Sequence, residues 1–449
     1  MLSKGEKLAT KSGLQLTITD GPWSGGQGAV YRVTDQRGHV YALKWYHDTY
    51  LNTEEKKKDQ WDSLSKIVGK SVGAEFAWPL ELVSIGASFG YIMEFVDYKR
   101  FIPLAKMKSG VAKYQPSLQT KVLISLNICN AFAKLHARGL CYRDINEGNI
   151  MFDVSTGDIK IMDNDNVGIE GASKSNVRGV PDFMAPEILC DFANTSPSKM
   201  TDYHSVAVYL FQLWMWHHPF DGNNVIYTRC FDRDAKVIYY GREPKFIFSP
   251  NNDNPLDPIA DAGTKDEEDY SYVHKLWAQC PEILQKLFIR AFTEGAKAPN
   301  KRPIDNAWAK AFRTVSDMTL RCPHCNAENL LCNKQVCWKC KKKYEKPLSL
   351  VVKKKDSPLK TAIVLNVDKY IYANVFNVSE GTSGIAKIAQ VVAHPKNPSV
   401  LGLRNCTSGD FSFTNAKGET VVVPPGKSVP VSTSNIIDFG NDYFGSFIS

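Results

Sequence analysis

The chain has 449 residues, of which 43% are hydrophobic and 23% are charged, and its formal net charge is +8 at pH 7. The length favours two to four domains, and the near-average composition argues against a disordered, collagenous or membrane-dominated chain. The excess of positive charge is mild for this length, so the short lysine runs favour solvated faces over a stripe that binds nucleic acid.

The N-terminus and the longest apolar stretch indicate where the protein works. The N-terminal residues contain no apolar segment or small-residue cleavage site of the kind that secretory signals have. The longest apolar stretch, 206–216, contains Gln212 and is too short to span a bilayer. We therefore expect a buried helix at this stretch, a cytoplasmic location and no membrane partner.

Residues 14–96 alternate apolar and polar side chains in short runs that glycines interrupt. This pattern predicts a small strand-rich lobe with one helix near 54–68. Gly25, Gly26 and Gly28 lie between two predicted strands, where the absence of side chains would let backbone amides approach the phosphates of a nucleotide. An ordinary glycine-rich hairpin is an equally good interpretation of this feature alone.

Lys44 lies further along, in the apolar segment VYALKWY. An inward-pointing lysine needs an anionic partner to offset its loss of hydration, and a phosphate of ATP is one candidate. The alternative is a strand lysine whose ammonium group reaches the solvent.

From 117 to 317 the apolar spacing becomes helical, which predicts a larger, helical lobe. One predicted helix ends at Gly139, because glycine suits the C-terminal cap of a helix. Residues 249–271 are rich in Pro, Asn and Asp, and this composition predicts a long surface insertion.

Three polar residues of this lobe have the spacing of a catalytic centre. Asp144 and Asn149 lie five residues apart in a predicted loop, and Asp163 follows a predicted buried strand. Phosphoryl transfer requires a carboxylate that orients the acceptor hydroxyl, and an Asn and a second carboxylate that hold Mg²⁺. The alternative is that Asp144 and Asn149 only form a turn, but the order and spacing of all three groups favour catalysis.

These motifs, together with the segment GVPDFMAPEI, resemble the eukaryotic-type protein kinase family over about residues 14–317. The resemblance implies an α+β, bilobal fold, with an N-lobe at 14–96 and a C-lobe at 97–317. It also implies that the protein uses ATP and Mg²⁺ to phosphorylate Ser or Thr of a protein substrate.

The resemblance further implies roles for single residues. Lys44 would contact the α- and β-phosphates, Asp144 would be the catalytic-loop aspartate, and Asn149 and Asp163 would hold Mg²⁺. Met93 would be the gatekeeper of the adenine pocket. The full set of residues implied to bind the nucleotide is Gly25, Gly26, Gly28, Val30, Ala42, Lys44 and Met93, with backbone contacts from Glu94 and Val96.

Further family features lie beyond the catalytic loop. Glu187 of the Ala-Pro-Glu signature and Arg302 match the buried ion pair of the family, and Asp202 would begin its buried central helix.

Arg143 precedes the catalytic aspartate, and in this family such an arginine often pairs with a phosphorylated residue. Ser173 and Ser175 are the hydroxyl residues between Asp163 and Glu187, so one of them is a predicted autophosphorylation site. The alternative is that Arg143 holds the loop through backbone carbonyls or a carboxylate.

Several positions depart from the family pattern. The departures are Tyr142 in place of histidine before Arg143-Asp144, Asn146 in place of the catalytic-loop lysine, Asp163-Asn164-Asp165 in place of Asp-Phe-Gly, and Val180 in place of threonine. The helix glutamate that should pair with Lys44 cannot be assigned, because Glu54 and Glu55 come early and Gln60 occupies the best helical register.

Five of the eleven cysteines crowd into 322–340, which suggests local metal ligation in a reducing compartment. Two Cys-x-x-Cys pairs predict a zinc ribbon at 318–347, and four thiolates would close the site, so the zinc would be structural. Disulfide pairing is the alternative to metal binding. Nucleic-acid binding by the ribbon is not favoured, because its sequence lacks the pattern of aromatic and basic residues that such surfaces have. The predicted ligands are Cys322, Cys325, Cys337 and Cys340, with Cys332 as a bystander.

Residues 348–449 predict a β-rich module that faintly resembles the second half of a forkhead-associated sandwich. The Gly-Arg and Ser-x-x-His contacts of that family are not found, which favours a protein-docking sandwich over a phosphopeptide reader. The order of kinase, ribbon and β module resembles bacterial kinases encoded with TerY-type von Willebrand proteins and PP2C-type phosphatases. That resemblance implies both as partners.

Two other functions compete with protein phosphorylation. The loop from Asp144 to Asn149 also suits small-molecule phosphotransferases that resemble aminoglycoside kinases, but Glu187 and Arg302 belong to a platform for protein substrates. A pseudokinase scaffold that acts through its C-terminal modules is the second alternative. The intact set of Lys44, Asp144, Asn149 and Asp163 argues against it.

Overall fold

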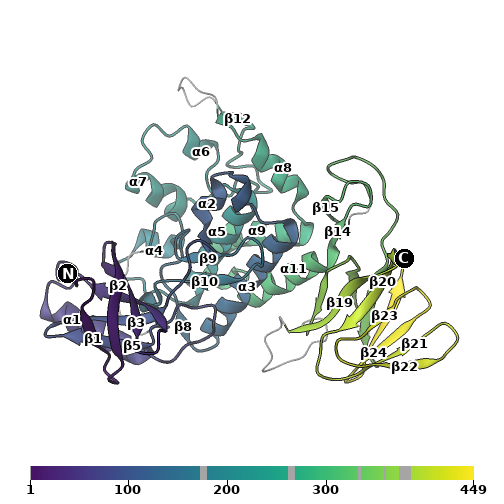
Figure 1. Ribbon diagram of the computed structural model, residues 1–449. Helices are drawn as coiled ribbons and strands as arrows, with labels where there is room; N and C mark the ends of the chain where they lie inside the picture. The colour runs from purple at the N-terminus through teal and green to yellow at the C-terminus, as the bar shows by residue number, and fades with distance from the viewer. Residues whose placement is uncertain (1, 172–178, 261–267, 332–334, 358–359, 374–385) are drawn as a thin grey trace. The chain divides into compact units, whose positions relative to one another are not determined.

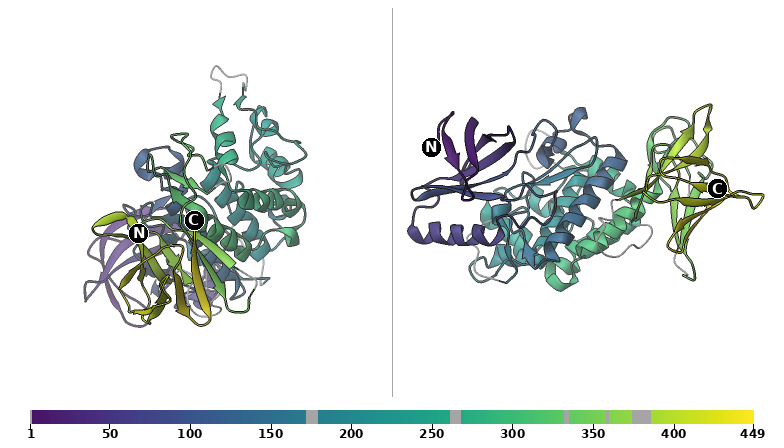
Figure 2. Two further views of the ribbon diagram at one scale, coloured as in Figure 1. Left: turned by 90° about the vertical axis from the view of Figure 1, so that its right-hand side faces the viewer. Right: turned by 60° about the horizontal axis from the view of Figure 1, so that its bottom comes forward.

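The computed structural model describes residues 2–171, 179–260, 268–331, 335–357, 360–373 and 386–449. The chain divides into two compact units, residues 1–311 and 312–449. The division falls inside helix α11 (Asp305–Met318). The first unit runs from purple through teal in Figures 1 and 2, and the second runs from green to yellow.

The N-lobe of the first unit is a six-stranded antiparallel sheet in the order β1-β2-β3-β4-β6-β5, with helix α1 (Glu54–Ile67) (Figure 1). Successive side chains of a strand point to opposite faces, so apolar side chains at alternate positions bury one face of the sheet in a hydrophobic core around Leu43. Thr53 caps α1 through its side chain, and the helix predicted near 54–68 is confirmed. The strands are β1 (Lys7–Ala9), β2 (Gln15–Ser24), β3 (Gly28–Asp35), β4 (Val40–Tyr46), β5 (Glu81–Ile85) and β6 (Ser88–Glu94).

The C-lobe consists mainly of helices around α5 (Lys199–Met215) (Figure 1). All residues from 201 to 215 are buried, which confirms the buried helix predicted at 206–216. Phe211 contacts Phe288 edge to face and contributes to an aromatic core. The other helices wholly within this unit are α2 (Leu104–Lys108), α3 (Leu118–His136), α4 (Pro186–Cys190), α6 (Asn223–Ile226), α7 (Arg233–Lys236), α8 (Ser271–Gln279), α9 (Glu282–Phe292) and α10 (Glu294–Lys297).

Helix α3 of the C-lobe ends close to the predicted position, and short strands border several loops of this lobe. Its last helical residue is His136, and Gly139 follows with a left-handed φ of 69°. Among the described helices, none combines the length and apolar character that a membrane crossing requires. The strands are β7 (Ile102–Pro103), β8 (Leu140–Cys141), β9 (Ile150–Phe152), β10 (Ile159–Ile161), β11 (Gly168–Ile169), β12 (Ile259–Ala260) and β13 (Glu268–Asp269).

The segment predicted as a surface insertion, 249–271, is partly buried where the structure describes it. Asn254 is 2% exposed, and its side-chain amide donates hydrogen bonds to the backbone carbonyls of Phe220 and Lys245. Leu256 is also buried. The predicted surface insertion agrees with the exposed residues 251–253 and 258–259, but it is wrong at Asn254 and Leu256. A polar composition does not distinguish a solvated Asn from one that satisfies buried carbonyls.

Besides the two-stranded sheet β14-β15, the second unit contains two larger antiparallel sheets that share one hydrophobic core. Leu350 and Phe447 come from the sheet β17-β16-β25-β24-β21-β22, and Val391 and Leu403 come from the sheet β18-β19-β20-β23. The likeness to a forkhead-associated sandwich stays a prediction. The strands are β14 (Thr319–Arg321), β15 (Glu328–Leu330), β16 (Ser349–Lys354), β17 (Lys360–Val364), β18 (Tyr370–Tyr372), β19 (Lys387–His394), β20 (Asn397–Asn405), β21 (Phe411–Thr414), β22 (Thr420–Val423), β23 (Ser428–Pro430), β24 (Ile436–Gly440) and β25 (Tyr443–Ile448).

Candidate active site and cysteine cluster

The predicted catalytic loop connects β8 to β9, and Asp202 in the first turn of α5 holds its start. The Asp202 carboxylate accepts hydrogen bonds from the backbone amides of Tyr142, at 2.6 Å, and Arg143, at 3.2 Å. Arg143 has a φ of 76°, which non-glycine residues rarely adopt. Two hydrogen bonds to a buried carboxylate therefore fix the backbone that precedes Asp144.

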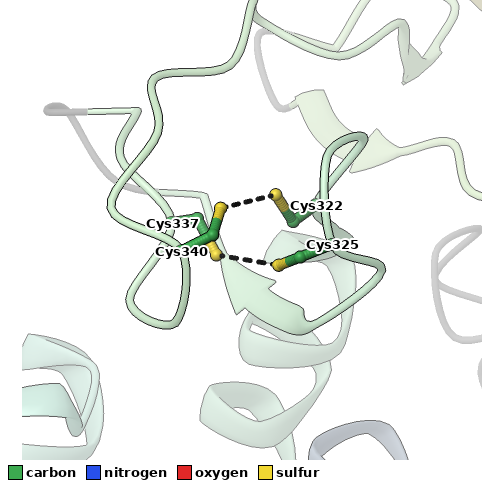
Figure 3. Close-up of side chains that lie close together, drawn as sticks. All are labelled: Cys322, Cys325, Cys337 and Cys340. Atoms are coloured by element: carbon green, nitrogen blue, oxygen red, sulfur yellow. Dashed lines mark hydrogen bonds between the residues drawn. The ribbon is translucent and has the colours of Figure 1, made fainter.

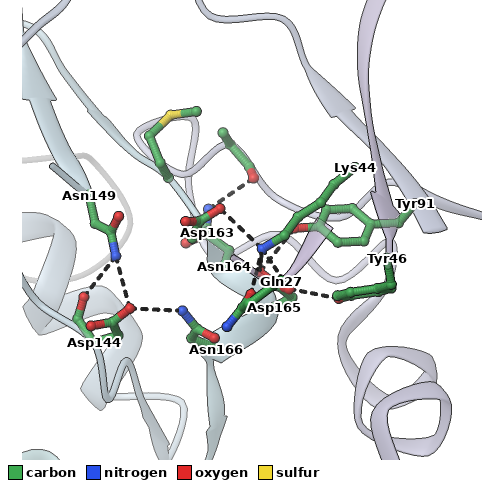
Figure 4. A network of polar contacts seen from close by, with 12 residues as sticks. Gln27, Lys44, Tyr46, Tyr91, Asp144, Asn149, Asp163, Asn164, Asp165 and Asn166 are labelled. Carbon is green, nitrogen blue, oxygen red and sulfur yellow. Dashed lines mark hydrogen bonds and ion pairs between the residues drawn. The ribbon is translucent and has the colours of Figure 1, made fainter. Parts of the chain in front are cut away.

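Asp144 lies in a net of side-chain amides, which Figure 4 shows in part. Its carboxylate accepts hydrogen bonds from Asn146 at 3.1 Å, from Asn149 at 3.2 Å and from Asn166 at 3.2 Å. Burial and the negative charge of Asp163 raise the pKa of Asp144 to about 6, although the bonds from Asn146 and Asn149 oppose the rise. A carboxylate with this pKa is ionised at neutral pH and can accept a hydrogen bond from a hydroxyl group.

Lys44 points inward from β4 and is the cation of the site (Figure 4). Its ammonium group lies 2.9 Å from Oδ2 and 3.0 Å from Oδ1 of Asp165, 3.2 Å from Oδ1 of Asp163, and 3.0 Å from Oε1 of Gln27. Burial alone would lower the pKa of Lys44, but the charges of Asp165 and Asp163 raise it above its usual range. The lysine is therefore a permanent positive charge.

Asp165 is the most enclosed carboxylate of this group, with a side chain that is 1% exposed. Besides Lys44, the hydroxyl groups of Tyr46, at 2.6 Å, and Tyr91, at 3.0 Å, donate hydrogen bonds to it. Burial would raise the pKa of Asp165, but the charge of Lys44 and these hydrogen bonds lower it.

Asp163 and Asn149 are the predicted ligands of Mg²⁺, and their oxygens belong to the hard donor class that this ion prefers. The Asp163 side chain is 42% exposed, so it faces space that a metal and phosphates can enter. Asn164, which directly follows Asp163, is fully buried and donates hydrogen bonds to the backbone carbonyls of Ala77 and Ile161, which holds this segment in place. The donor set fits Mg²⁺.

The glycines of the N-lobe have different local surroundings. A Cβ atom at Gly26 would meet nothing within 4 Å, so the tip of the hairpin is open. At Gly28 a Cβ atom would collide with the backbone carbonyl of Trp45, so this glycine is required by the pairing of β3 with β4. Gly25 donates its amide to the Gly28 carbonyl at 2.8 Å.

The remaining predicted nucleotide-binding residues come from neighbouring strands. Val30 pairs with Lys44 across β3 and β4, and Ala42 pairs with Met93 across β4 and β6. Strand register therefore brings these side chains to one region of the sheet.

The last two predicted adenine contacts follow Met93 in sequence. The Glu94 carboxylate forms an ion pair with Lys160 at 2.6 Å, and Val96 is 3% exposed. The side chain of Glu94 is thus engaged elsewhere, which leaves its backbone for the predicted contact.

Glu187 and Arg302 form a bidentate ion pair, with N–O distances of 2.7 and 2.6 Å. The Arg302 side chain is 1% exposed, and it also donates to the backbone carbonyls of Gly295 and Met200. The pair therefore ties the segment after the catalytic site to the helical core.

A cavity of about 410 Å³ lies beside the catalytic loop. Asn146 and Glu147 of the loop line it together with Val180 and Phe183. Val180, which departs from the family pattern, is 40% exposed at this cavity.

His136 joins three helices behind the catalytic loop. Its ring lies 3.1 Å from Asp202 and 2.6 Å from Asp305. Burial alone would lower the pKa of His136, but the hydrogen bonds and charges of both carboxylates raise it to about 9. Because an unfolded histidine titrates near 6.5, the folded protein holds this proton more tightly.

We expect His136 to contribute about 3 kcal/mol of stability below pH ~6.5, and this contribution to disappear as the pH rises through about 9. Urea unfolding between about pH 6 and pH 9.5 should show the free energy of wild type falling relative to a His136→Gln variant. Parallel pH profiles for the two proteins would contradict the expected proton linkage.

Sequence reasoning missed several residues that complete the site. Gln27, Tyr46 and Tyr91 contact Lys44 or its partner carboxylate, and Asp165 was noted only as a departure from the family pattern. Two separate features of the sequence carry a signal: Asp165 is an extra carboxylate where the family pattern has glycine, and Lys44 has no assigned partner in the predicted helix.

Arg143 has one feature that bears on the predicted phosphorylation. Its Nε atom is buried and has no hydrogen-bond partner within the part of the chain that the structure describes. Ser173 and Ser175, the predicted autophosphorylation sites, lie outside the described residues. Their pairing with Arg143 stays a prediction.

The four predicted zinc ligands come together in the second unit (Figure 3). Their sulfur atoms all lie within 4.8 Å of one another, at 3.7 Å between Cys322 and Cys340 and at 3.6 Å between Cys325 and Cys337. Four thiolates bonded to zinc at about 2.3 Å would lie about 3.8 Å apart, so the arrangement fits a tetrahedral zinc site. Cys332 lies outside the described residues.

The surroundings of Cys337 favour its thiolate form. The Asn329 side-chain amide and the Lys339 backbone amide donate to the Cys337 sulfur at 3.5 and 3.4 Å. Burial opposes ionisation, but hydrogen bonds from Cys340, Asn329 and Lys339 lower the pKa of Cys337 to about 6. A ligand that ionises readily binds metal at neutral pH.

Comparison with known proteins identifies a family and relatives of this chain. A family model described as "Protein kinase domain" matches residues 24–281, which is more than half of the chain. A cell cycle serine/threonine-protein kinase of Saccharomyces cerevisiae is 25% identical over 217 residues, which cover 47% of this chain and 29% of that protein. A probable cAMP-dependent protein kinase catalytic subunit of Encephalitozoon cuniculi is 24% identical over 232 residues, 51% of this chain and 66% of that protein. The chain thus spans less than two thirds of either relative.

Proposed function

Because the chain belongs to the protein kinase family, we propose that it transfers the γ-phosphoryl group of ATP, with Mg²⁺, to a Ser or Thr hydroxyl of a protein substrate. The observation that carries this proposal is the meeting of Lys44, Asp163 and the Asp144–Asn149 loop between the two lobes of the first unit. These are the groups that a kinase requires to bind phosphates, hold Mg²⁺ and orient the acceptor.

The proposed roles follow from the charges and positions of the residues. Lys44 binds the α- and β-phosphates of ATP, and Asp163 and Asn149 hold Mg²⁺, which supplies charge neutralisation at the phosphates when it is bound. Asp144 orients the acceptor hydroxyl and takes its proton as the new O–P bond forms and the bond to ADP breaks.

A protein acceptor is favoured over a small molecule by the buried pair of Glu187 and Arg302. This pair anchors the segment beside the cavity that Val180 and Phe183 line, where an extended peptide could present its hydroxyl group. The names of the two relatives, both protein kinases, favour the same acceptor class. Preference for Ser or Thr over Tyr is part of the proposal.

Transfer of ³²P from labelled ATP to a generic protein such as casein tests the proposal, with an aminoglycoside panel as the competing acceptors. We expect Mg²⁺-dependent label on protein Ser or Thr and none on the aminoglycosides. Label on the small molecules alone would favour the small-molecule phosphotransferase. Absence of transfer to any acceptor, with ATP still bound, would favour the pseudokinase scaffold.

The second unit has features that favour two further roles, which are binding of a structural zinc ion and docking of partner proteins. We propose that Cys322, Cys325, Cys337 and Cys340 bind one Zn²⁺, for which their sulfur separations are suitable. The order of kinase domain, cysteine cluster and β module also supports, by resemblance alone, a TerY-type von Willebrand protein and a PP2C-type phosphatase as partners. Co-purification with either protein tests that pairing.

A further inference from the structure

Helix α1 does not supply the carboxylate that holds Lys44. Gln60 is the α1 residue in the best register for that role, and its side-chain amide donates instead to the Tyr46 hydroxyl at 2.8 Å. The described partners of the Lys44 ammonium group are Gln27, Asp163 and Asp165, all outside α1.

Two of these partners are carboxylates, and they differ in what else they must do. Asp163 is 42% exposed and is the proposed Mg²⁺ ligand, so the metal would compete with Lys44 for its oxygens. Asp165 is 1% exposed, and both of its oxygens lie within 3.0 Å of the Lys44 ammonium group. It can therefore keep its contact with Lys44 when metal and nucleotide are bound.

The surroundings of Asp165 fix its carboxylate before the nucleotide arrives. Hydroxyl groups of Tyr46 and Tyr91 donate to Oδ2 and Oδ1, one to each oxygen (Figure 4). A buried carboxylate with three hydrogen-bonded partners has little freedom to rotate, and a buried lysine that loses it would be left without a compensating charge.

Protein kinases place a phosphate-binding lysine by pairing it with a glutamate from a helix of the N-lobe. We propose that Asp165 is the positioning residue for Lys44 and takes the place of that helix glutamate. This inference deepens the proposed function and rests on it. The pair joins β4 to the short 3-10 turn Asn164–Asn166, whereas the described hydrogen bond from α1 toward it runs from Gln60 to Tyr46 and does not reach Lys44 directly.

One consequence is that the orientation of Lys44 depends on the Asp163–Asp165 segment and only weakly on α1. The carboxylate and the Mg²⁺ ligand lie two residues apart on one turn, so a shift of this turn would move both together. Movement of α1 would break the hydrogen bond from Gln60 to Tyr46, but it would leave the contacts of Asp165 with Lys44, Tyr46 and Tyr91 in place.

The test compares Asp165→Asn with Asp153→Asn, because Asp153 is a buried aspartate that pairs with Arg100 away from the site. We expect Asp165→Asn to lower kcat/KM for ATP by about 100-fold and to weaken ATP binding by about 10-fold, since Lys44 loses its fixed orientation. Asp153→Asn should change both by less than about threefold. Lys44→Met combined with Asp165→Asn should lose little more than either single change, because the two residues act as one unit.

A rescue variant separates positioning from a general loss of structure. Asp165→Gly should lose as much activity as Asp165→Asn. Adding Gln60→Glu to Asp165→Gly should restore activity by at least about 10-fold. The new carboxylate at 60 would lie beside the Tyr46 hydroxyl group, which in the wild type contacts both Gln60 and Asp165. If Asp165→Asn does not fold, the pair of glycine-based variants decides the question.

Folded Asp165→Asn with kcat/KM and ATP affinity within about twofold of wild type would overturn the inference. So would an Asp165→Gly/Gln60→Glu variant no better than Asp165→Gly. Failure of the proposed function is a different result, since wild type would then transfer no phosphate. In that case the ATP affinities of the same variants still decide whether Asp165 positions Lys44.

Discussion

The Asp144→Asn variant is expected to transfer phosphate at least about 100-fold more slowly than wild type, and Asp163→Asn is expected to lose at least as much. Asn at 144 keeps the size of the side chain and can still contact Asn149 and Asn166, but it cannot take the proton of the acceptor hydroxyl. Asn at 163 removes the charge that the proposed metal needs. Initial rates with labelled ATP and a protein acceptor measure both losses.

The two variants should differ in how the loss appears. Asp144→Asn should lower kcat with little change in ATP affinity, because the proposed role of Asp144 is to act on the acceptor hydroxyl and not on ATP. Asp163→Asn should also weaken binding of Mg²⁺ and ATP, because Asp163 is the proposed ligand of the Mg²⁺ that accompanies ATP. An exposed aspartate outside the site, Asp158, gives the control variant Asp158→Asn, which should keep its activity.

Retention of near wild-type turnover by folded Asp144→Asn and Asp163→Asn would show that the active site lies elsewhere. Thermal unfolding of each variant separates a chemical effect from a structural one. We expect shifts in unfolding temperature of a few degrees at most for Asp144→Asn, because its side chain is only partly buried.

The grouping of Asp144, Asn149 and Asp163 in one candidate site could be predicted from sequence, because all three lie in one short stretch of loop and strand. In the structure the Asn149 side-chain amide donates hydrogen bonds to the backbone carbonyl and the carboxylate of Asp144, and a separation of five residues favours such local bonds. The central helix and α1 could be predicted as well, since their apolar periods and caps are local properties.

The partner of Lys44 could not be predicted, because it depends on contacts between distant parts of the chain. Asp165 is 121 residues from Lys44 in sequence, and nothing near Asp165 marks it as buried. Asn254 is a similar case, since its burial depends on two backbone carbonyls that only the folded C-lobe brings to it. Polar residues that satisfy buried groups look, in sequence, like residues of an exposed loop.

Removal of zinc is expected to unfold the cysteine cluster before the rest of the chain. The core around the cluster is small, with Leu320, Tyr344 and Val364 as its buried residues besides two of the cysteines. Such a core cannot offset the entropy of ordering the loops, and zinc bound by thiolates contributes about 10–16 kcal/mol of folding free energy in comparable peptides. We expect one zinc per chain by elemental analysis of protein purified under reducing conditions.

Single serine substitutions of one cysteine inside the cluster and one outside it provide a matched pair of variants. Cys337→Ser should lower the zinc content to well below one per chain and expose 319–347 to limited proteolysis, because its thiolate is buried and hydrogen-bonded inside the cluster. Cys406→Ser, a cysteine of the same unit outside the cluster, should change neither. Phosphoryl transfer should survive Cys337→Ser, since the cysteines and the catalytic residues belong to separate compact units. Purified wild type without zinc, or Cys337→Ser with full zinc content, would show that the cluster is not a structural zinc site.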